Sequence, residues 1–199
     1  MARQPDVIGV ILAGGSGRRM GGAKATVGLH GRPLISYALE AVWRALGTAV
    51  VVAKADTELP SLPGVTVWVE PEEIRHPLIG LRYALEMAGG RPILACAADL
   101  PFVTPRLIRE LAEGAPRAPA LVASSGDQIQ PLLGWYHPRA LPQLRRIDPA
   151  SGVPVREAIS RLAPDRLEVD PELLFNVNTP SDLLQASVQI DQWMRDGQP

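Results

Sequence analysis

A glycine-rich stretch near the start of the chain carries the residues best suited to chemistry. An apolar run over residues 7–13 leads into glycines and cations, in the order Gly14, Gly15, Gly17, Arg18, Arg19 and Lys24. Glycines let the backbone approach a ligand because no Cβ intervenes, and the N–H groups of such a loop can point at an anion. The pattern favours a phosphate-binding loop. The alternative is a tight turn between a strand and a helix, with its cations in solvent.

The glycine spacing matches neither of two common phosphate-binding motifs. In the dinucleotide fingerprint G-x-G-x-x-G, Gly15 and Gly17 would take the first two positions, but Met20 occupies the third. The P-loop requires Gly-Lys-Ser or Gly-Lys-Thr, whereas Lys24 stands between two alanines. The phosphate hypothesis therefore depends on the glycines and the cations together.

A single carboxylate, Asp99, follows a second wholly apolar run over residues 93–98. A magnesium ion takes one or two carboxylates from the protein and completes its shell with phosphate and water. The alternative is an aspartate that only shapes the turn before Pro101. With a phosphate loop predicted nearby in the sheet, the metal-binding interpretation of Asp99 is favoured.

Two asparagines near the C-terminus form a third candidate group. Asn176 and Asn178 flank one apolar residue, so on a strand both side chains would lie on the same face. Two amides on one face can hydrogen-bond to a polar ring, or to the ribose and phosphate of a substrate. Equally, they can be turn-forming residues before a helix that begins at Pro180.

Short apolar runs alternate with segments of helical periodicity along the chain. Strands are predicted over residues 7–13, 48–53, 65–69, 91–98, 120–124, 130–136 and 167–169. Helices are predicted over residues 34–46, 81–88, 105–113, 138–146, 156–162 and 180–194. Strands that are apolar throughout are typical of a mostly parallel sheet covered on both faces. The sequence thus predicts a three-layer α/β/α, Rossmann-like fold in one domain over 1–199, with 130–174 as a candidate acceptor-binding lobe.

The candidate residues share a position relative to the predicted strands. Ligands of open α/β sheets bind beyond the carboxyl ends of the strands, where the strand order reverses. The glycine loop, Glu70 and Asp99 each follow a predicted strand. We therefore expect them to line one crevice.

The composition bounds the possible partners. The chain has 199 residues and a formal net charge of -1, so no long-range field recruits nucleic acid or an anionic membrane. The single cysteine, Cys96, cannot form an internal disulfide and lies in an apolar run, which predicts a small buried side chain. No apolar run approaches membrane-spanning length, and residues 1–6 lack a signal-peptide core. We expect a cytoplasmic protein.

Four segments resemble one family. Residues 12–24 resemble the signature of nucleotidyltransferases that move a nucleoside monophosphate from an NTP onto a phosphate. Asp99-Leu100-Pro101 resembles the family's metal-binding aspartate. Residues 76–80, 130–138 and 175–183 resemble segments of the molybdenum cofactor guanylyltransferases (MobA type). The resemblance implies a fold of the nucleotide-diphospho-sugar transferase type, and magnesium-dependent transfer of GMP from GTP to molybdopterin with release of pyrophosphate.

The resemblance also implies roles for individual residues. The backbone of the first loop residues would hold the guanine or ribose of GTP: Leu12, Ala13 and Gly14. Other loop residues would hold the triphosphate: Gly15, Gly17, Arg19 and Lys24. Further nucleotide contacts are implied at Ala53 and Glu70, and acceptor contacts at Gly80, Asn176 and Asn178. Asp99 would bind Mg²⁺ and, with Lys24 and Arg19, carry the catalysis.

The chain departs from the family pattern at several positions. Ala23 stands where the family has an aspartate before the loop lysine, and Ala53 where an asparagine is frequent. His76 replaces a glycine, and Val153 and Pro154 stand where arginines are usual. Two alternatives therefore stay open: a cytidylyltransferase acting on the same or another small phosphate, and a non-catalytic relative that binds nucleotide.

Overall fold

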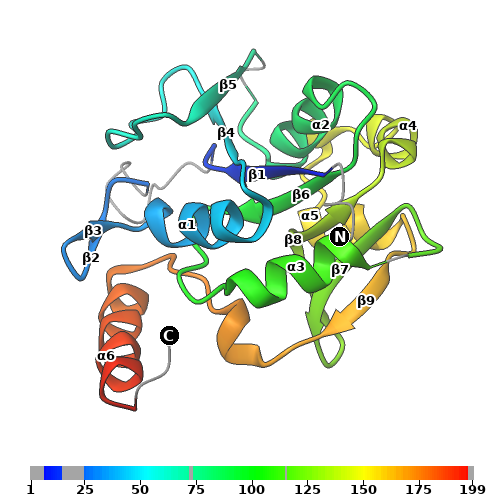
Figure 1. The fold of residues 1–199 in the computed structure, drawn as a ribbon. Coiled ribbons are helices and arrows are strands. Elements are labelled where there is room, and N and C mark those ends of the chain that lie inside the picture. Colours follow the sequence, from blue (N-terminus) through cyan, green and yellow to red (C-terminus); the bar gives the residue numbers. More distant parts are fainter. Residues whose placement is uncertain (1–6, 15–24, 72–73, 115, 197–199) are drawn as a thin grey trace.

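A seven-stranded sheet runs through the centre of the molecule (Figure 1). The computed structural model describes residues 7–14, 25–71, 74–114 and 116–196. The strand order is β5-β4-β1-β6-β8-β7-β9. In chain order the strands are β1 (Ile8–Leu12), β4 (Val50–Lys54), β5 (Thr66–Glu70), β6 (Ile93–Ala97), β7 (Ala120–Ser125), β8 (Gln128–Tyr136) and β9 (Asp165–Glu168).

Most neighbouring strands run parallel. β5, β4, β1 and β6 form a continuous parallel set, and β9 runs parallel to β7. β8 is antiparallel to both of its neighbours, β6 and β7. The predicted mostly parallel α/β sheet is therefore confirmed, with one reversed strand inserted near its middle.

Helices cover both faces of the sheet, which gives three layers. α1 (Ile35–Leu46) and α3 (Pro105–Glu113) pack on one face, in a core cluster that includes Ile11. α2 (Pro77–Met87), α4 (Leu141–Arg145) and α5 (Val155–Ser160) pack on the other, with Val10. Val10 and Ile11 are both fully buried, because successive strand residues point to opposite faces and each face is covered.

A smaller apolar cluster attaches the last helix, α6 (Pro180–Asp196), to Leu29 and Leu34 and to Phe102, which follows β6 (Figure 1). α6 lies beside a short hairpin of β2 (Gly28–Leu29) and β3 (Arg32–Pro33). The rings of Phe102 and Trp193 meet edge to face, with centroids 4.8 Å apart. The turn of the hairpin places His30 and Gly31 at φ 48° and 71°, the pair of left-handed residues that a tight hairpin turn requires.

Several predicted boundaries were wrong. α2 begins at Pro77, four residues before the predicted start, because the His76 ring accepts a hydrogen bond from the Leu78 amide and caps the helix. The predicted helix over 138–146 is divided into a 3₁₀ turn (Pro138–Ala140) and α4. Within the range 130–174, β8 belongs to the central sheet and α4 and α5 lie against α2. The acceptor-binding role of this range stays a prediction.

Candidate nucleotide site

The candidate site lies at the carboxyl ends of β1, β4, β5 and β6. Leu12 pairs in register with Val52 of β4 and Ala97 of β6. The pairing continues past the strand, since the Ala13 amide donates to the Val52 carbonyl at 2.8 Å and the Ala98 amide to the Leu12 carbonyl at 3.1 Å. These bonds place the first loop residues and Asp99 beyond the same edge of the sheet.

Part of the predicted site falls outside the described residues. Gly15, Gly17, Arg19 and Lys24 lie in the stretch 15–24, which the structure does not describe. Their roles in phosphate binding stay predictions. Leu12, Ala13 and Gly14, which lead into this stretch, are described.

Glu70 forms the centre of the first group of side chains. It is the last residue of β5, pairs in register with Lys54 of β4 and makes an ion pair with the Lys54 ammonium group. A Cβ built on Gly14 would lie 3.6 Å from Glu70 Oε1, and one built on Gly80 would lie 3.1 Å from Glu70 Oε2. The structure thus brings together Glu70, Gly14 and Gly80, three residues that the sequence singled out separately.

Lys54 was missed by the sequence analysis. The predicted strand ended at Ala53, and no motif pointed to the next residue. The useful signal was the position of a lysine at the end of a buried strand, in register with a glutamate that ends the neighbouring strand. The Ala53 side chain lies in the core under α1. The nucleotide contact that the resemblance implies at Ala53 stays a prediction.

Asp99 belongs to a chain of side-chain hydrogen bonds. The Asn176 amide donates to Asp99 Oδ1 at 3.2 Å, and the Gln130 amide donates to Asn176 Oδ1 at 2.7 Å. The backbone joins the same segments, because the Val177 amide donates to the Asp99 carbonyl at 3.0 Å. The order of donors fixes the Asn176 amide so that its nitrogen faces the carboxylate. Gln130 was the second functional candidate that the sequence analysis missed.

Of the two interpretations left open for Asn176 and Asn178, the structure does not show the strand. Residues 175–178 form no ladder with the sheet. Asn178 is exposed, and its backbone N–H donates to Asp182 Oδ2 at 2.8 Å, at the start of α6. The side-chain alternation of a strand therefore does not apply. The Asn176 side chain contacts Asp99, and the Asn178 backbone contacts Asp182 in the first turn of α6.

The donor set around Asp99 suits a magnesium ion. One carboxylate with amide groups beside it, at an edge where phosphate is expected, matches the few protein ligands that Mg²⁺ takes. Within the described part of the chain, no group of three or more His, Cys, Asp or Glu side chains forms a metal site. Cys96 is fully buried on β6, and burial first and Asp99 second raise the pKa of its thiol. A buried thiol of this kind does not act as a nucleophile.

Two departures from the family pattern contact each other. His76 Nε2 lies 2.9 Å from the Val153 carbonyl, while Nδ1 accepts from the Leu78 amide at 3.2 Å. In this arrangement Nδ1 accepts and Nε2 faces a carbonyl oxygen. His76 therefore joins the start of α2 to the segment before α5.

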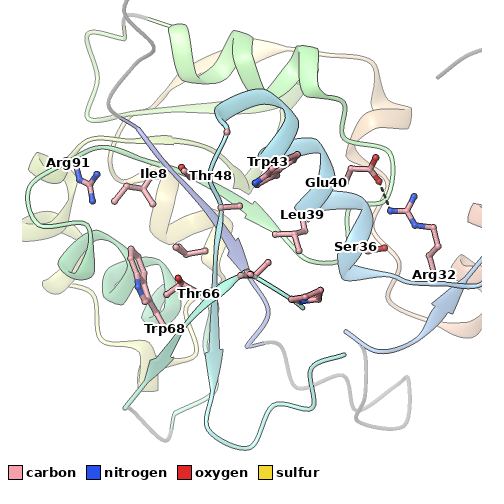
Figure 2. Close-up of a pocket in the computed structure, with 16 residues that line it drawn as sticks. Ile8, Arg32, Ser36, Leu39, Glu40, Trp43, Thr48, Thr66, Trp68 and Arg91 are labelled. Carbon is pink, nitrogen blue, oxygen red and sulfur yellow. Dashed lines mark hydrogen bonds and ion pairs between the residues drawn. The ribbon is translucent and has the colours of Figure 1, made fainter. Parts of the chain in front are cut away.

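A broad open depression of about 860 Å³ lies at a different place (Figure 2). It is lined by Ile8, Val50 and Thr66, the first residues of β1, β4 and β5, and by the exposed ring of Trp43 on α1. The amino ends of these strands are opposite the edge that carries Asp99 and Glu70. The depression is therefore separate from the candidate nucleotide site.

None of the helices in the described ranges combines the length and the apolar character needed to cross a bilayer.

The chain resembles known proteins over nearly its whole length. The model of the MobA-like NTP transferase domain family matches residues 9–166. The chain is 32% identical over 197 residues to the molybdenum cofactor guanylyltransferase of Rhodobacter capsulatus, with 94% of this chain and 97% of the relative covered.

Solved structures give the same result. The fold is similar to that of molybdopterin-guanine dinucleotide biosynthesis protein A from Archaeoglobus fulgidus, with a TM-score of 0.77, 26% identity, and coverage of 94% of this chain and 100% of that one. It is also similar, with a TM-score of 0.69, to a Mycobacterium tuberculosis H37Rv protein in complex with manganese. At 20% identity, with 92% and 98% of the two chains covered, this second likeness shows the fold alone. The resemblance inferred from the motifs is confirmed, and the chain belongs to the MobA-like NTP transferase family.

Proposed function

We propose that this chain transfers GMP from GTP to the terminal phosphate of a molybdopterin-type acceptor, forming the guanine dinucleotide cofactor and pyrophosphate. The observation that carries the proposal is the convergence, at one edge of the sheet, of Gly14 with Glu70 and of Asp99 with Asn176. Membership of the MobA-like family and the name of the Rhodobacter capsulatus relative support the same reaction. The buried free Cys96 and the net charge of -1 agree with a cytoplasmic enzyme that takes small substrates.

The reaction needs no covalent intermediate on the protein. An oxygen of the acceptor phosphate attacks the α-phosphorus of GTP, and the bond from that phosphorus to the β-bridging oxygen breaks as pyrophosphate leaves. Both partners are anionic, so the protein must orient them and offset charge on the leaving group. We assign the triphosphate to the backbone of Gly15 and Gly17 and to the side chains of Arg19 and Lys24.

Asp99 is the residue we assign to Mg²⁺, with Asn176 holding its carboxylate in place. Bound there, the ion would supply positive charge that draws the phosphates together and offsets charge developing on them. The Asn176 amide restricts rotation of the carboxylate through its bond to Oδ1. Gln130 in turn fixes the orientation of the Asn176 amide. Asn178 stays assigned to the acceptor side, whereas Gly80, which the resemblance also assigned there, lies against Glu70 on the nucleotide side.

Substitution of Asp99 tests the reaction. We expect Asp99→Asn to lower turnover by about 10²–10³-fold, the usual cost of removing one electrostatic contact in an active site. The assay measures pyrophosphate release and the dinucleotide product by mass spectrometry, with GTP, Mg²⁺ and molybdopterin cofactor. The matched control is Asp127→Asn in the exposed turn between β7 and β8, which should keep normal turnover. Near-normal activity of Asp99→Asn would remove Asp99 from the mechanism.

A thermal-shift comparison tests the nucleotide. GTP with Mg²⁺ should raise the unfolding temperature more than CTP, ATP or UTP at equal concentration. Preferential stabilisation by CTP would instead identify a cytidylyltransferase. Absence of a shift with all four nucleotides would identify a relative that has lost nucleotide binding.

A further inference from the structure

The ion pair between Lys54 and Glu70 is shielded from solvent to an unusual degree. Their side chains are 6% and 3% exposed, whereas those of Arg145 and Glu86 in a surface pair are 59% and 40% exposed. Burial of two charges costs nearly as much free energy as their attraction returns, so an apolar pair would stabilise the fold about as well. Stability alone therefore does not account for this pair.

The pair lies where the nucleotide loop begins. Glu70 Oε1 is the atom nearest to a Cβ built on Gly14, at 3.6 Å, and Lys54 Cγ is 4.0 Å from the same point. The other oxygen, Oε2, lies 3.1 Å from a Cβ built on Gly80. Each oxygen of the carboxylate therefore lies close to a glycine, Oε1 to Gly14 and Oε2 to Gly80. Gly80 is also a glycine inside a helix, where alanine is the more favourable residue, so its position calls for a local reason.

We propose that Lys54 is a positioning residue for base selection. It holds the Glu70 carboxylate beneath Gly14, and the two oxygens of Glu70 accept hydrogen bonds from N1–H and the N2 amino group of guanine. This inference rests on the proposed function and on the family resemblance, which implies that the guanine or ribose of GTP lies against the backbone of Leu12, Ala13 and Gly14. It adds a residue that the family pattern did not indicate and a reason for the choice of base.

The chemistry of the bases explains the selection. Guanine presents two adjacent N–H donors, which match the two oxygens of one carboxylate. Hypoxanthine has the ring N–H but lacks the amino group. Cytosine presents one amino donor beside a ring nitrogen that only accepts, so it can satisfy at most one of the two carboxylate oxygens and sets an acceptor against the other. A buried carboxylate left without donors is strongly unfavourable, so a site of this kind rejects the wrong base.

The test compares nucleotide preference in variants of the pair. Binding of GTP, ITP and CTP with Mg²⁺ is measured by calorimetry for the wild type, Lys54→Met, Lys54→Arg, Glu70→Gln and Lys54→Met/Glu70→Gln. The double variant leaves no unpaired charge, which protects the test if Lys54→Met alone fails to fold. The control is Arg82→Met, which removes hydrogen bonds to the carbonyls of Leu144 and Ile147 and should lower stability without touching the site.

We expect the wild type to prefer GTP over ITP by about 10-fold or more, the value of one hydrogen bond to a charged group. Lys54→Met should lose most of that preference, and Lys54→Arg, which keeps the cation, should retain more of it. The double variant should show the same ratio as Glu70→Gln, because Lys54 acts through Glu70. Arg82→Met should lower the unfolding temperature and keep the wild-type ratio.

The inference is overturned if Lys54→Met keeps the wild-type GTP:ITP ratio, or if Lys54→Arg loses as much of the ratio as Lys54→Met. It is also overturned if the double variant loses more selectivity than Glu70→Gln. These results would leave the proposed function intact as long as the wild type binds GTP and forms the dinucleotide product. A wild type that binds no nucleotide would overturn the proposed function itself.

Discussion

Gly80→Ala separates the two demands on the start of α2, helix stability and access to Glu70. Gly80 is the fourth residue of the helix and is buried. A methyl group there would meet Leu12 Cδ2 at 3.6 Å and Val52 Cγ1 at 3.7 Å, which are ordinary contacts. It would meet Glu70 Oε2 at 3.1 Å, which is too close. The carboxylate must therefore move by a few tenths of an ångström, away from its place between the two glycines.

The two contributions to the free energy of unfolding nearly cancel. Replacing a helical glycine with alanine stabilises by about 1 kcal/mol. Lengthening an ion pair of about 3 Å by a few tenths of an ångström costs roughly 0.5 kcal/mol at an effective dielectric constant of about 20. We therefore expect the free energy of unfolding to change by less than about 1 kcal/mol. The methyl group nevertheless covers one carboxylate oxygen, so the preference for GTP over ITP should fall.

Urea unfolding without nucleotide and calorimetry with GTP and ITP measure the two effects separately. Gly28→Ala is the control, because a Cβ built on Gly28 meets nothing within 4 Å. It should leave both stability and nucleotide preference unchanged. A Gly80→Ala variant that gains the full stability of a helical alanine and keeps its GTP preference would refute the reasoning, since the carboxylate would then have no role beneath Gly80.

Three further substitutions test the metal site, the packing of the sheet and the pH dependence of stability. Gln130→Leu should weaken the apparent Mg²⁺ affinity in the transfer assay by about 10-fold, because partners behind a metal ligand typically contribute that much. The control is Gln128→Leu, at an exposed position of the same strand. Equal Mg²⁺ affinities of the two variants would contradict the prediction. Gly134→Ala should lower the free energy of unfolding by about 2–3 kcal/mol in urea, since its Cβ would lie 2.6 Å from the Leu121 carbonyl oxygen, and a loss no greater than that of Gly28→Ala would refute it. The pKa of His137 is lowered, by burial first and by Arg139 second, so the fold favours the neutral ring. The free energy of unfolding should therefore decline as the pH falls below about 6.5. Unfolding curves at pH 7.5 and 5.5 should show a smaller decline for His137→Asn, which keeps an acceptor for the Arg139 backbone N–H.

The alternation of apolar runs and helical segments was enough to predict the layers, because the runs that form β1, β4, β6 and β7 are buried on both faces. It did not place β8. The Gly126-Asp127 pair between β7 and β8 is a typical hairpin signal and makes their antiparallel pairing readable. The insertion of β8 beside β6 is a choice among apolar strands far apart in the chain, and local sequence carries no information about it.

For a related reason, the sequence could not decide whether residues 175–178 form a strand. Its alternating pattern fits a strand, but a strand also needs a partner that supplies a ladder of hydrogen bonds. Here the Val177 amide donates to the Asp99 carbonyl, next to the end of β6, and residues 175–178 form no ladder. The long-range side-chain contact between Asn176 and Asp99, 77 residues apart, takes the place of the ladder. Such a contact is decided by tertiary packing.

The register of β4 against β5 decides whether the Lys54–Glu70 pair exists at all. Side chains alternate between the two faces of a sheet, so a slip of one residue would turn Lys54 from the α2 face to the α1 face. Val51 and Ala53 would then leave the core under α1, where both are almost fully buried. The apolar residues that precede Lys54 in β4 therefore hold the register that places its ammonium group against Glu70. Strand packing positions this half of the site, and side-chain hydrogen bonds position the half around Asp99. Changes to the core of β4 should accordingly disturb base selection before they disturb metal binding.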